Sequence, residues 1–328
     1  MSTLLAWLQK HLVWSIPGAM ALGLVFGSTI DAGFLRWAIL PLTFLMVYPM
    51  MVTMNLRALT AAGSGKLQGT ALAINFILMP LIGWGIGMLF FAGEPAARLA
   101  LLLTALLPTS GMTISWTGFA KGNVPAAVKM TVVGLVAGSL LAPLYLKALL
   151  GAVIEIPVGQ VALQIALIVF LPMALGHFTQ KALISRHGQD CFNVQIKPRF
   201  PPWSTLGVLG IVFVSMALKA PDILRSPQTL ATLLVPLVLL YAVNFTLSTL
   251  IGRALFPRGD AVALVYGTVM RNLSIALAIA IGVFREEGAD AALLIALAYI
   301  VQVQAAAWYV RWTDRFFGAA PAPAGRAS

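Results

Sequence analysis

Leu107-Pro108-Thr109-Ser110-Gly111-Met112-Thr113 interrupts one long apolar run, and Gly267-Thr268-Val269-Met270-Arg271-Asn272-Leu273-Ser274 interrupts another in the second half of the chain. Proline removes a backbone hydrogen bond and breaks or kinks a helix, so Pro108 and Gly111 predict a helix break. Irregular backbone survives in a membrane only where it lines a cavity or is buried in protein. Paired breaks in the two halves therefore predict a transporter binding site. A Pro-kinked packing helix, with its hydroxyls bonded to a neighbour, is the simpler alternative.

The composition around these breaks is that of an integral membrane protein. Charged residues make up 9% of the 328 residues, against about 25% in soluble domains. Hydrophobic residues make up 60%, and the mean hydropathy is +0.94. These values exclude a cytosolic enzyme, a nucleic-acid binder and a disordered scaffold. The net charge of +11 is first a topology signal, because Lys and Arg collect in cytoplasmic loops.

The apolar runs predict an all-α protein with ten transmembrane helices. A helix needs about 20 residues to cross the hydrocarbon, and uniform apolar runs do not alternate in polarity as barrel strands do. The expected spans are 12–30, 37–56, 68–92, 96–120, 124–150, 160–183, 204–220, 228–252, 261–284 and 291–313.

The distribution of basic residues predicts that both termini are cytoplasmic in a bacterial inner membrane. The longest connection, 184–203, contains Arg186, Lys197 and Arg199. We interpret it as a solvated basic loop near lipid headgroups, with a specific lipid or partner site as the alternative. Residues 318–328 are rich in Ala, Pro and Gly and are predicted to be disordered.

A short internal repeat divides the chain into two halves. Ile74-Asn75-Phe76-Ile77-Leu78 resembles Val243-Asn244-Phe245-Thr246-Leu247, and each is followed by Leu-Ile-Gly. Five spans in each half, residues 1–156 and 157–317, would insert the second repeat in the opposite orientation, which is the architecture of many secondary transporters. A chance match between short apolar segments is the alternative. We expect Asn75, Asn244, Gln302 and Gln304 to bond one helix to another.

Three motifs resemble the bile acid:sodium symporter family and its arsenite-efflux permease relatives, of which this chain looks like a divergent bacterial-type member. They are Leu107-Pro108-Thr109-Ser110-Gly111, Ala120-Lys121-Gly122-Asn123-Val124 and Met270-Arg271-Asn272-Leu273-Ser274-Ile275-Ala276-Leu277-Ala278. The resemblance implies a ten-helix inverted repeat. Spans three to five and eight to ten would form a core domain, in which the fourth and ninth spans unwind and cross. Spans one, two, six and seven would form a panel domain, with a small organic anion bound in the crevice between them.

The chain departs from the family at the sodium ligands. The resemblance places the former cation-site positions at Gly267, Arg271, Ser110, Gly111, Ala127 and Thr131, with Lys129 between the last two. A glycine and an arginine thus stand where sodium-coupled members carry a glutamate and a glutamine. In the sequence, all ten acidic residues fall in loops or at the ends of expected spans, although sodium and proton coupling usually depend on a carboxylate within the membrane.

Arg271 leads to the central hypothesis about mechanism. A buried guanidinium carries a permanent charge and a planar fork of donors, so it could replace the sodium ion and leave an uncoupled transporter. A structural arginine that never meets substrate is the alternative. We predict that the substrate-binding residues lie at the two breaks, namely Arg271, Asn272, Ser274, Thr109, Ser110, Thr113 and Thr268.

Other functions remain open. The first is a sodium-coupled symporter with hydroxyl and carbonyl ligands alone. The second is an arsenite or metalloid efflux permease, although the single cysteine, Cys191, lies outside the fourth span. The third is an anion channel. We expect no enzyme activity, because His11, His177 and His187 have no metal-binding spacing. No cofactor is expected apart from a possible sodium ion, and the expected partners are the organic anion and the lipid bilayer, without nucleic acid. The oligomeric state and the direction of transport stay open.

Overall fold

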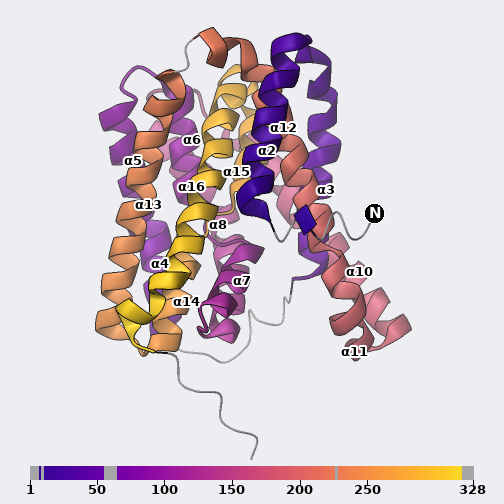
Figure 1. Cartoon of the computed structure of the whole chain (residues 1–328), viewed down its shortest axis with the longest axis vertical. Coiled ribbons are helices and arrows are strands. Elements are labelled where there is room, and N and C mark those ends of the chain that lie inside the picture. Colours follow the sequence, from indigo (N-terminus) through magenta and orange to yellow (C-terminus); the bar gives the residue numbers. More distant parts are fainter. Residues whose placement is uncertain (1–6, 9–10, 55–64, 226–227, 320–328) are drawn as a thin grey trace, which may run out of the picture.

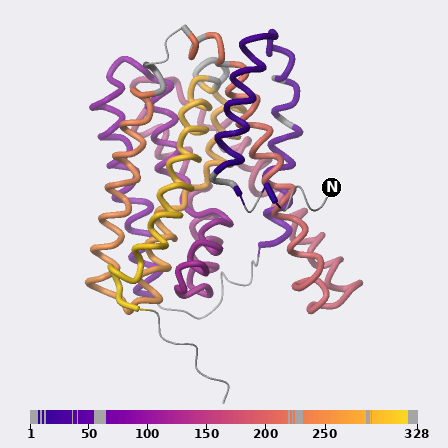
Figure 2. Tube along the Cα trace, viewed as in Figure 1, coloured from indigo at the N-terminus to yellow at the C-terminus, as the bar shows by residue number. Residues whose placement is uncertain are grey.

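The computed structural model describes residues 7–8, 11–54, 65–225 and 228–319. Within these ranges the chain is all-helical, with one isolated β-bridge and no β-strand, which confirms the prediction of an all-α protein (Figures 1 and 2). Of the tail predicted to be disordered, residues 320–328 lie outside the described residues.

Helices overlie each of the ten predicted apolar stretches, and two of these stretches contain a five-residue π-helical turn, as does the 184–203 connection. The first half contains α2 (Leu12–Thr29), η1 (Ala32–Ala38), α3 (Ile39–Val52), α4 (Gly65–Ala73), η3 (Ile74–Leu78), α5 (Met79–Phe90), α6 (Pro95–Leu106), α7 (Gly111–Phe119) and α8 (Val124–Leu150). The second half contains α9 (Val158–Ile165), η4 (Ala166–Phe170), α10 (Leu171–His187), α11 (Gln189–Cys191), η5 (Phe192–Ile196), η6 (Lys197–Arg199), α12 (Pro201–Arg225), α13 (Gln228–Leu255), α14 (Arg258–Val269), α15 (Leu273–Val283) and α16 (Arg285–Phe317).

Several of these helices can cross a bilayer, which supports a multi-pass membrane protein. Six described segments are long and apolar enough to do so: Gly65–Phe90, Val124–Leu150, Val158–His187, Gln189–Leu218, Ala231–Leu255 and Asp290–Phe317. Shorter apolar helices occupy Pro41–Val52, Pro95–Leu106 and Leu273–Val283. The last two are short because each belongs to a segment that a break divides in two.

The helices form two groups (Figures 1 and 2). One group contains α2, α3, α10 and α12, in which α12 packs along both α2 and α3, and α10 packs on α3. Side chains bond these helices: the Tyr48 and Thr179 hydroxyls lie 2.8 Å apart, and the Gln180 amide donates to the Val52 carbonyl at 3.0 Å. The other group contains α4 to α8 and α13 to α16. The crevice described below lies between the two groups.

Glycine lets α2 approach α12 closely. Gly23 and Gly27 are one turn apart on α2, and a Cβ atom at either position would overlap the backbone carbonyl of Phe213 or of Ala217 on α12. Small residues four apart allow such contact between membrane helices, where van der Waals packing replaces the hydrophobic drive. The α2–α12 pair is therefore a tightly packed unit.

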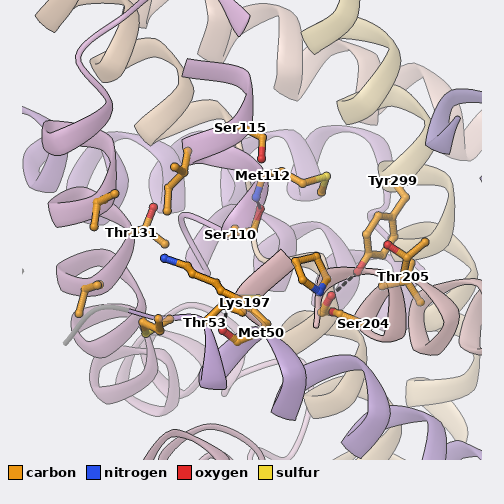
Figure 3. A pocket seen from close by; sticks show the side chains of 18 of the residues that line it. Met50, Thr53, Ser110, Met112, Ser115, Thr131, Lys197, Ser204, Thr205 and Tyr299 are labelled. Atoms are coloured by element: carbon orange, nitrogen blue, oxygen red, sulfur yellow. Dashed lines mark hydrogen bonds between the residues drawn. The ribbon is translucent and has the colours of Figure 1, made fainter. Parts of the chain in front are cut away.

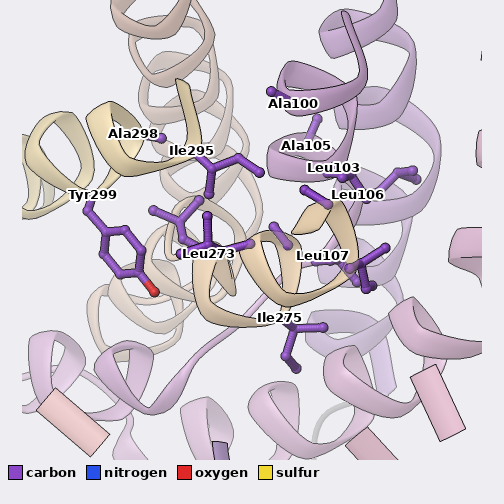
Figure 4. Close-up of a cluster of buried hydrophobic side chains, with 14 of the residues drawn as sticks. Ala100, Leu103, Ala105, Leu106, Leu107, Leu273, Ile275, Ile295, Ala298 and Tyr299 are labelled. Atoms are coloured by element: carbon purple, nitrogen blue, oxygen red, sulfur yellow. The ribbon is translucent and has the colours of Figure 1, made fainter. Parts of the chain in front are cut away.

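Apolar side chains surround the second helix break. Leu107, at the end of α6, and Leu273 and Ile275, at the start of α15, are buried together with Ile295 and Tyr299 of α16 (Figure 4). Close packing of this kind holds the ends of the interrupted helices in one arrangement.

We expect Gly27→Val to destabilise the protein by about 1–3 kcal/mol, because the new side chain must displace the backbone of α12. Gly18→Val is the matched control on the same helix, since a Cβ atom there meets nothing within 4 Å. Thermal unfolding in detergent measures both. Equal destabilisation by the two variants would show that the α2–α12 contact is not specifically stabilising.

Candidate functional site

The two interrupted helices meet at their breaks. α6 ends at Leu106 and α7 begins at Gly111, while α14 ends at Val269 and α15 begins at Leu273. The unwound segments pair as an antiparallel bridge between Pro108 and Arg271, and the Asn272 amide donates to the Leu107 carbonyl at 2.8 Å. Pro108 thus lies between two helices, and Gly111 is the first residue of the second one. Because α6 and α7 are separate helices, this segment is not one continuous helix with a proline kink.

Side chains at the breaks cap the new helix ends. The Ser110 hydroxyl accepts from the Met112 amide, and the Thr113 hydroxyl accepts from the Ser110 amide, both at 3.3 Å, which forms a capping box at the start of α7. The Asn272 side chain caps α15 by accepting from the Ile275 amide at 3.3 Å. These side chains thus accept hydrogen bonds from backbone amides that have no partner within the helix.

Thr109 takes an uncommon backbone conformation between the capped ends. Its φ angle is 60°, a left-handed value that β-branched residues rarely adopt. Its hydroxyl donates to the Thr131 carbonyl on α8 at 3.1 Å. The first break is thereby bonded to α8.

Three side-chain amides hold the second break. Asn75 donates to the Gly267 carbonyl at 3.0 Å, and Asn244 donates to the neighbouring Thr268 carbonyl at 2.9 Å. Gln302 of α16 accepts from the Arg271 amide at 2.7 Å and donates to the Arg271 carbonyl at 3.3 Å. The expectation that these amides bond one helix to another is confirmed, and the two repeat-related asparagines bond adjacent residues.

Arg271 is buried in the middle of this crossing. Its side chain is 1% exposed, and Nη1 donates to the Asn75 side-chain oxygen at 3.0 Å. Nε and Nη2 have no hydrogen-bond partner, and no ion pair with a carboxylate involves Arg271 among the residues whose side chains the structure describes. The guanidinium follows the carboxyl end of α14, where the helix dipole favours a positive charge.

A cavity of about 360 Å³ lies between the two helix groups (Figure 3). Residues from α2, α3, α12 and the short η6 form one wall, and residues from α7, α8, α15 and α16 form the other. The lining consists of Ile16, Met50, Thr53, Met54, Ser110, Gly111, Met112, Ile114, Ser115, Val128, Thr131, Val132, Lys197, Pro201, Ser204, Thr205, Val208, Ser274 and Tyr299. The surface is thus mainly apolar with many hydroxyl groups.

The structure divides the predicted site residues into two sets. Ser110, Gly111, Thr131 and Ser274 line the cavity, and the Ser274 hydroxyl lies 2.6 Å from that of Tyr299. The other predicted residues do not line it: Thr109, Thr113, Thr268, Arg271, Asn272, Ala127, Gly267 and Lys129.

Arg271 and its neighbours lie behind the cavity wall because the crossing turns them toward Asn75, Asn244 and Gln302. In this conformation the guanidinium therefore holds the crossing together and does not contact the cavity. This arrangement matches the structural role that the sequence left as an alternative.

The sequence analysis missed several polar residues of the cavity, namely Ser115, Ser204, Thr205, Tyr299 and the charged residue Lys197. We expected Lys197 in a solvated basic loop, but η6 brings it into the cavity, where its side chain extends between the two walls (Figure 3). This connection folds as helical turns, and most of its side chains are exposed, but Phe192 is buried and Lys197 is half-buried. Phe192 is the one feature of the sequence that could have indicated that part of this basic connection is buried.

Lys197 determines the charge of the cavity. It is the single charged residue in the described lining, which contains no carboxylate. Within the described residues no group of three or more His, Cys, Asp or Glu side chains could hold a metal ion. An ammonium group in a mainly apolar site attracts anions strongly, because the surroundings screen the charge less than water does.

Comparison with known proteins identifies the family. Residues 40–226 match the family model described as the Sodium Bile acid symporter family, so the chain belongs to that family, which is one of membrane transporters and not of enzymes.

Relatives match most of the chain. An uncharacterized protein, YbaS, of Bacillus subtilis is 25% identical over 82% of this chain and 86% of its own length. The arsenical-resistance protein Acr3 of Corynebacterium glutamicum is 21% identical over 88% of this chain and 84% of its own. An uncharacterized transporter, slr0944, of a Synechocystis species is 22% identical over 74% of this chain and 72% of its own length.

We expect Asn75→Leu to destabilise the protein more than Asn244→Leu, by about 1–2 kcal/mol. Both variants lose a bond to a backbone carbonyl, but only the first also removes the partner of a buried charge, and hydrogen bonds to charged groups are about twice as strong as neutral ones. Chemical or thermal unfolding of the two repeat-related variants measures the difference. An equal loss would mean that the Arg271–Asn75 bond contributes nothing.

Proposed function

We propose that the protein is a secondary transporter that moves a small organic anion through the cavity between its two helix groups by alternating access. The observation that carries the proposal is Lys197, the only charged group in the described lining of a cavity that otherwise presents apolar and hydroxyl surface. An anion with a polar head and an apolar body complements such a lining. We take the group of α2, α3, α10 and α12 as the panel domain and the group of α4 to α8 and α13 to α16 as the core domain.

Hydroxyl groups complete the polar part of the substrate site. Ser110 and Thr131 come from the core, whereas Thr53, Ser204 and Thr205 come from the panel. The Thr53, Thr131 and Ser204 hydroxyls already donate to backbone carbonyls, so a substrate oxyanion would accept hydrogen bonds from Ser110 and Thr205, which adds no charge to the site. This division between the two domains suits a carrier in which both domains contact the substrate and move relative to each other.

Arg271 supports transport without sodium. The fixed guanidinium lies at the carboxyl end of α14, donates to Asn75 and is held through its own backbone by Gln302. A sodium ion at this crossing would have to lie beside a buried positive charge, without a carboxylate among the described lining residues to offset the cost of removing its water. In this proposal Arg271 supplies permanently the charge that a bound ion supplies transiently in sodium-coupled relatives.

The ten-span inverted repeat belongs to the same proposal. Its support is the pairing of equivalent elements: two interrupted helices cross at Pro108 and Arg271, and two equivalent asparagines bond adjacent carbonyls. By the positive-inside rule we place both termini in the cytoplasm of a bacterial cell.

Arsenical efflux is the second candidate, favoured by the similarity to Acr3. Thiolates suit a soft metalloid, but Cys191 lies on α11 outside the cavity lining. The lining therefore favours the organic anion. A ligand panel should contain arsenite beside carboxylates and sulfonates.

We expect Lys197→Gln to weaken anion binding about 10- to 100-fold, because a hydrogen bond to a charged group contributes about 1.5–3 kcal/mol. Ligand-induced thermal stabilisation with the anion panel identifies a ligand, and uptake into liposomes then compares the variants. Arg199→Gln is the control, since it removes the same charge from the same connection without entering the cavity. Unchanged binding in Lys197→Gln would remove the basis of the proposal.

We expect uptake of that ligand to be the same in sodium and in potassium or choline buffer, because Arg271 occupies the cation site. Thermal stability should likewise not depend on sodium. Sodium-dependent stabilisation that disappears in Thr131→Val would contradict the uncoupled mechanism and favour a symporter with hydroxyl and carbonyl ligands.

A further inference from the structure

A second cavity lies on the outer face of the protein, between α13 and α16, away from the proposed substrate site. It has a volume of about 470 Å³ and is mainly apolar, with Phe245, Leu250, Trp308, Trp312 and Phe316 among its lining residues. Trp308 and Trp312 are 61% and 49% exposed. In a membrane-spanning pair of helices, this face is turned toward lipid.

The polar groups on the floor of this groove are paired with each other. The Thr249 hydroxyl bonds both the Phe245 carbonyl and the Tyr309 hydroxyl. The Phe245 and Tyr309 rings lie 4.8 Å apart, centroid to centroid, and close the groove from behind. The open part is an apolar groove between α13 and α16, which run side by side (Figures 1 and 2).

Arginines mark one end of the groove. Arg253 continues the groove-lining face of α13, one turn beyond Thr249, and Arg311 and Arg315 flank the Trp308 and Trp312 face of α16. The three arginine side chains are exposed. The neighbouring Asp314 does not neutralise them, because its carboxylate is paired with Arg258 at 2.5 Å.

The dimensions of the groove match one lipid leaflet. At about 1.5 Å per residue, the path from Ala242 to Arg253 is about 16 Å long, and the path from Gln304 to Arg315 has the same length. One leaflet contributes about 15 Å of hydrocarbon. An acyl chain in the groove therefore places its headgroup at the arginines, at the level where tryptophan is enriched in membrane proteins.

We propose that the α13–α16 groove is a binding site for an anionic phospholipid. An acyl chain packs against Leu250, Trp308 and Phe316, and the phosphate accepts hydrogen bonds from Arg253, Arg311 and Arg315. Guanidinium groups suit this ligand because their planar fork binds phosphate through two donors. The site does not depend on the proposed transport function.

The test titrates purified full-length protein in mild detergent with phosphatidylglycerol or with phosphatidylcholine of the same acyl chains. Native mass spectrometry reads the bound lipid. We expect the protein to prefer phosphatidylglycerol, and the triple variant Arg253→Gln, Arg311→Gln, Arg315→Gln to lower that affinity by about fivefold per arginine. Binding of phosphatidylcholine should stay unchanged in this variant.

Two further variants separate the site from general effects of charge. Lys181→Gln, Arg186→Gln, Arg199→Gln removes the same charge from another exposed region and should keep the preference. Ala305→Leu fills the groove and should weaken binding of both lipids. A preference that survives the first triple variant, or that both triple variants lose equally, overturns the proposal. So does a dimer mass that disappears in Ala305→Leu, because the groove would then be an interface between copies of the chain.

Discussion

The structure depends on one requirement, which is that the backbone groups released at two helix breaks find partners inside a protein surrounded by hydrocarbon. Each break releases amides and carbonyls from helical hydrogen bonds, and these groups need partners within the protein or the cavity. The two unwound segments satisfy part of this need by pairing with each other at Pro108 and Arg271. Asn75, Asn244 and Gln302, from three different helices, satisfy most of the rest at the second break. The crossing is therefore bonded to several helices, although two nitrogens of the Arg271 guanidinium have no partner, and the cavity lies in front of it.

The sequence predicted the parts of this arrangement that leave a local signal. Pro108 and Gly111 indicated the first break, the polar run around Arg271 indicated the second, and the matched Asn75 and Asn244 indicated side chains that bond helices together. The sequence could not predict the direction in which each side chain leaves the crossing. Such a direction depends on the backbone conformation of a few irregular residues, as at Thr109 with its φ of 60°. For this reason Arg271 was grouped with substrate contacts, although the structure buries it behind the cavity wall.

The roles of Lys197 and of the pair Gly23 and Gly27 could not be predicted from the sequence for a different reason. Lys197 lies in a connection whose composition suggested solvent exposure, and only the folding of that connection into helical turns brings the ammonium group into the cavity. Gly23 and Gly27 are two of 29 glycines, and their spacing gains meaning only from the position of α12. In both cases the role of the residue is set by a partner distant in sequence. Composition and periodicity describe a segment by itself, so they do not report such partners.

The close contact of α2 and α12 has a mechanical consequence. Lys197 lies on η6, the short turn that leads into α12, and α12 contacts the α2 backbone at Gly23 and Gly27. Because the two backbones are in direct contact there, we expect α2 and α12 to move as one unit. Lys197 would move with them, because η6 leads directly into α12. Ser110 and Thr131 belong to the opposite wall. In the proposed transport cycle, an anion bound between Lys197 and these hydroxyls would connect the two helix groups, so its binding or release would act on the α2–α12 pair.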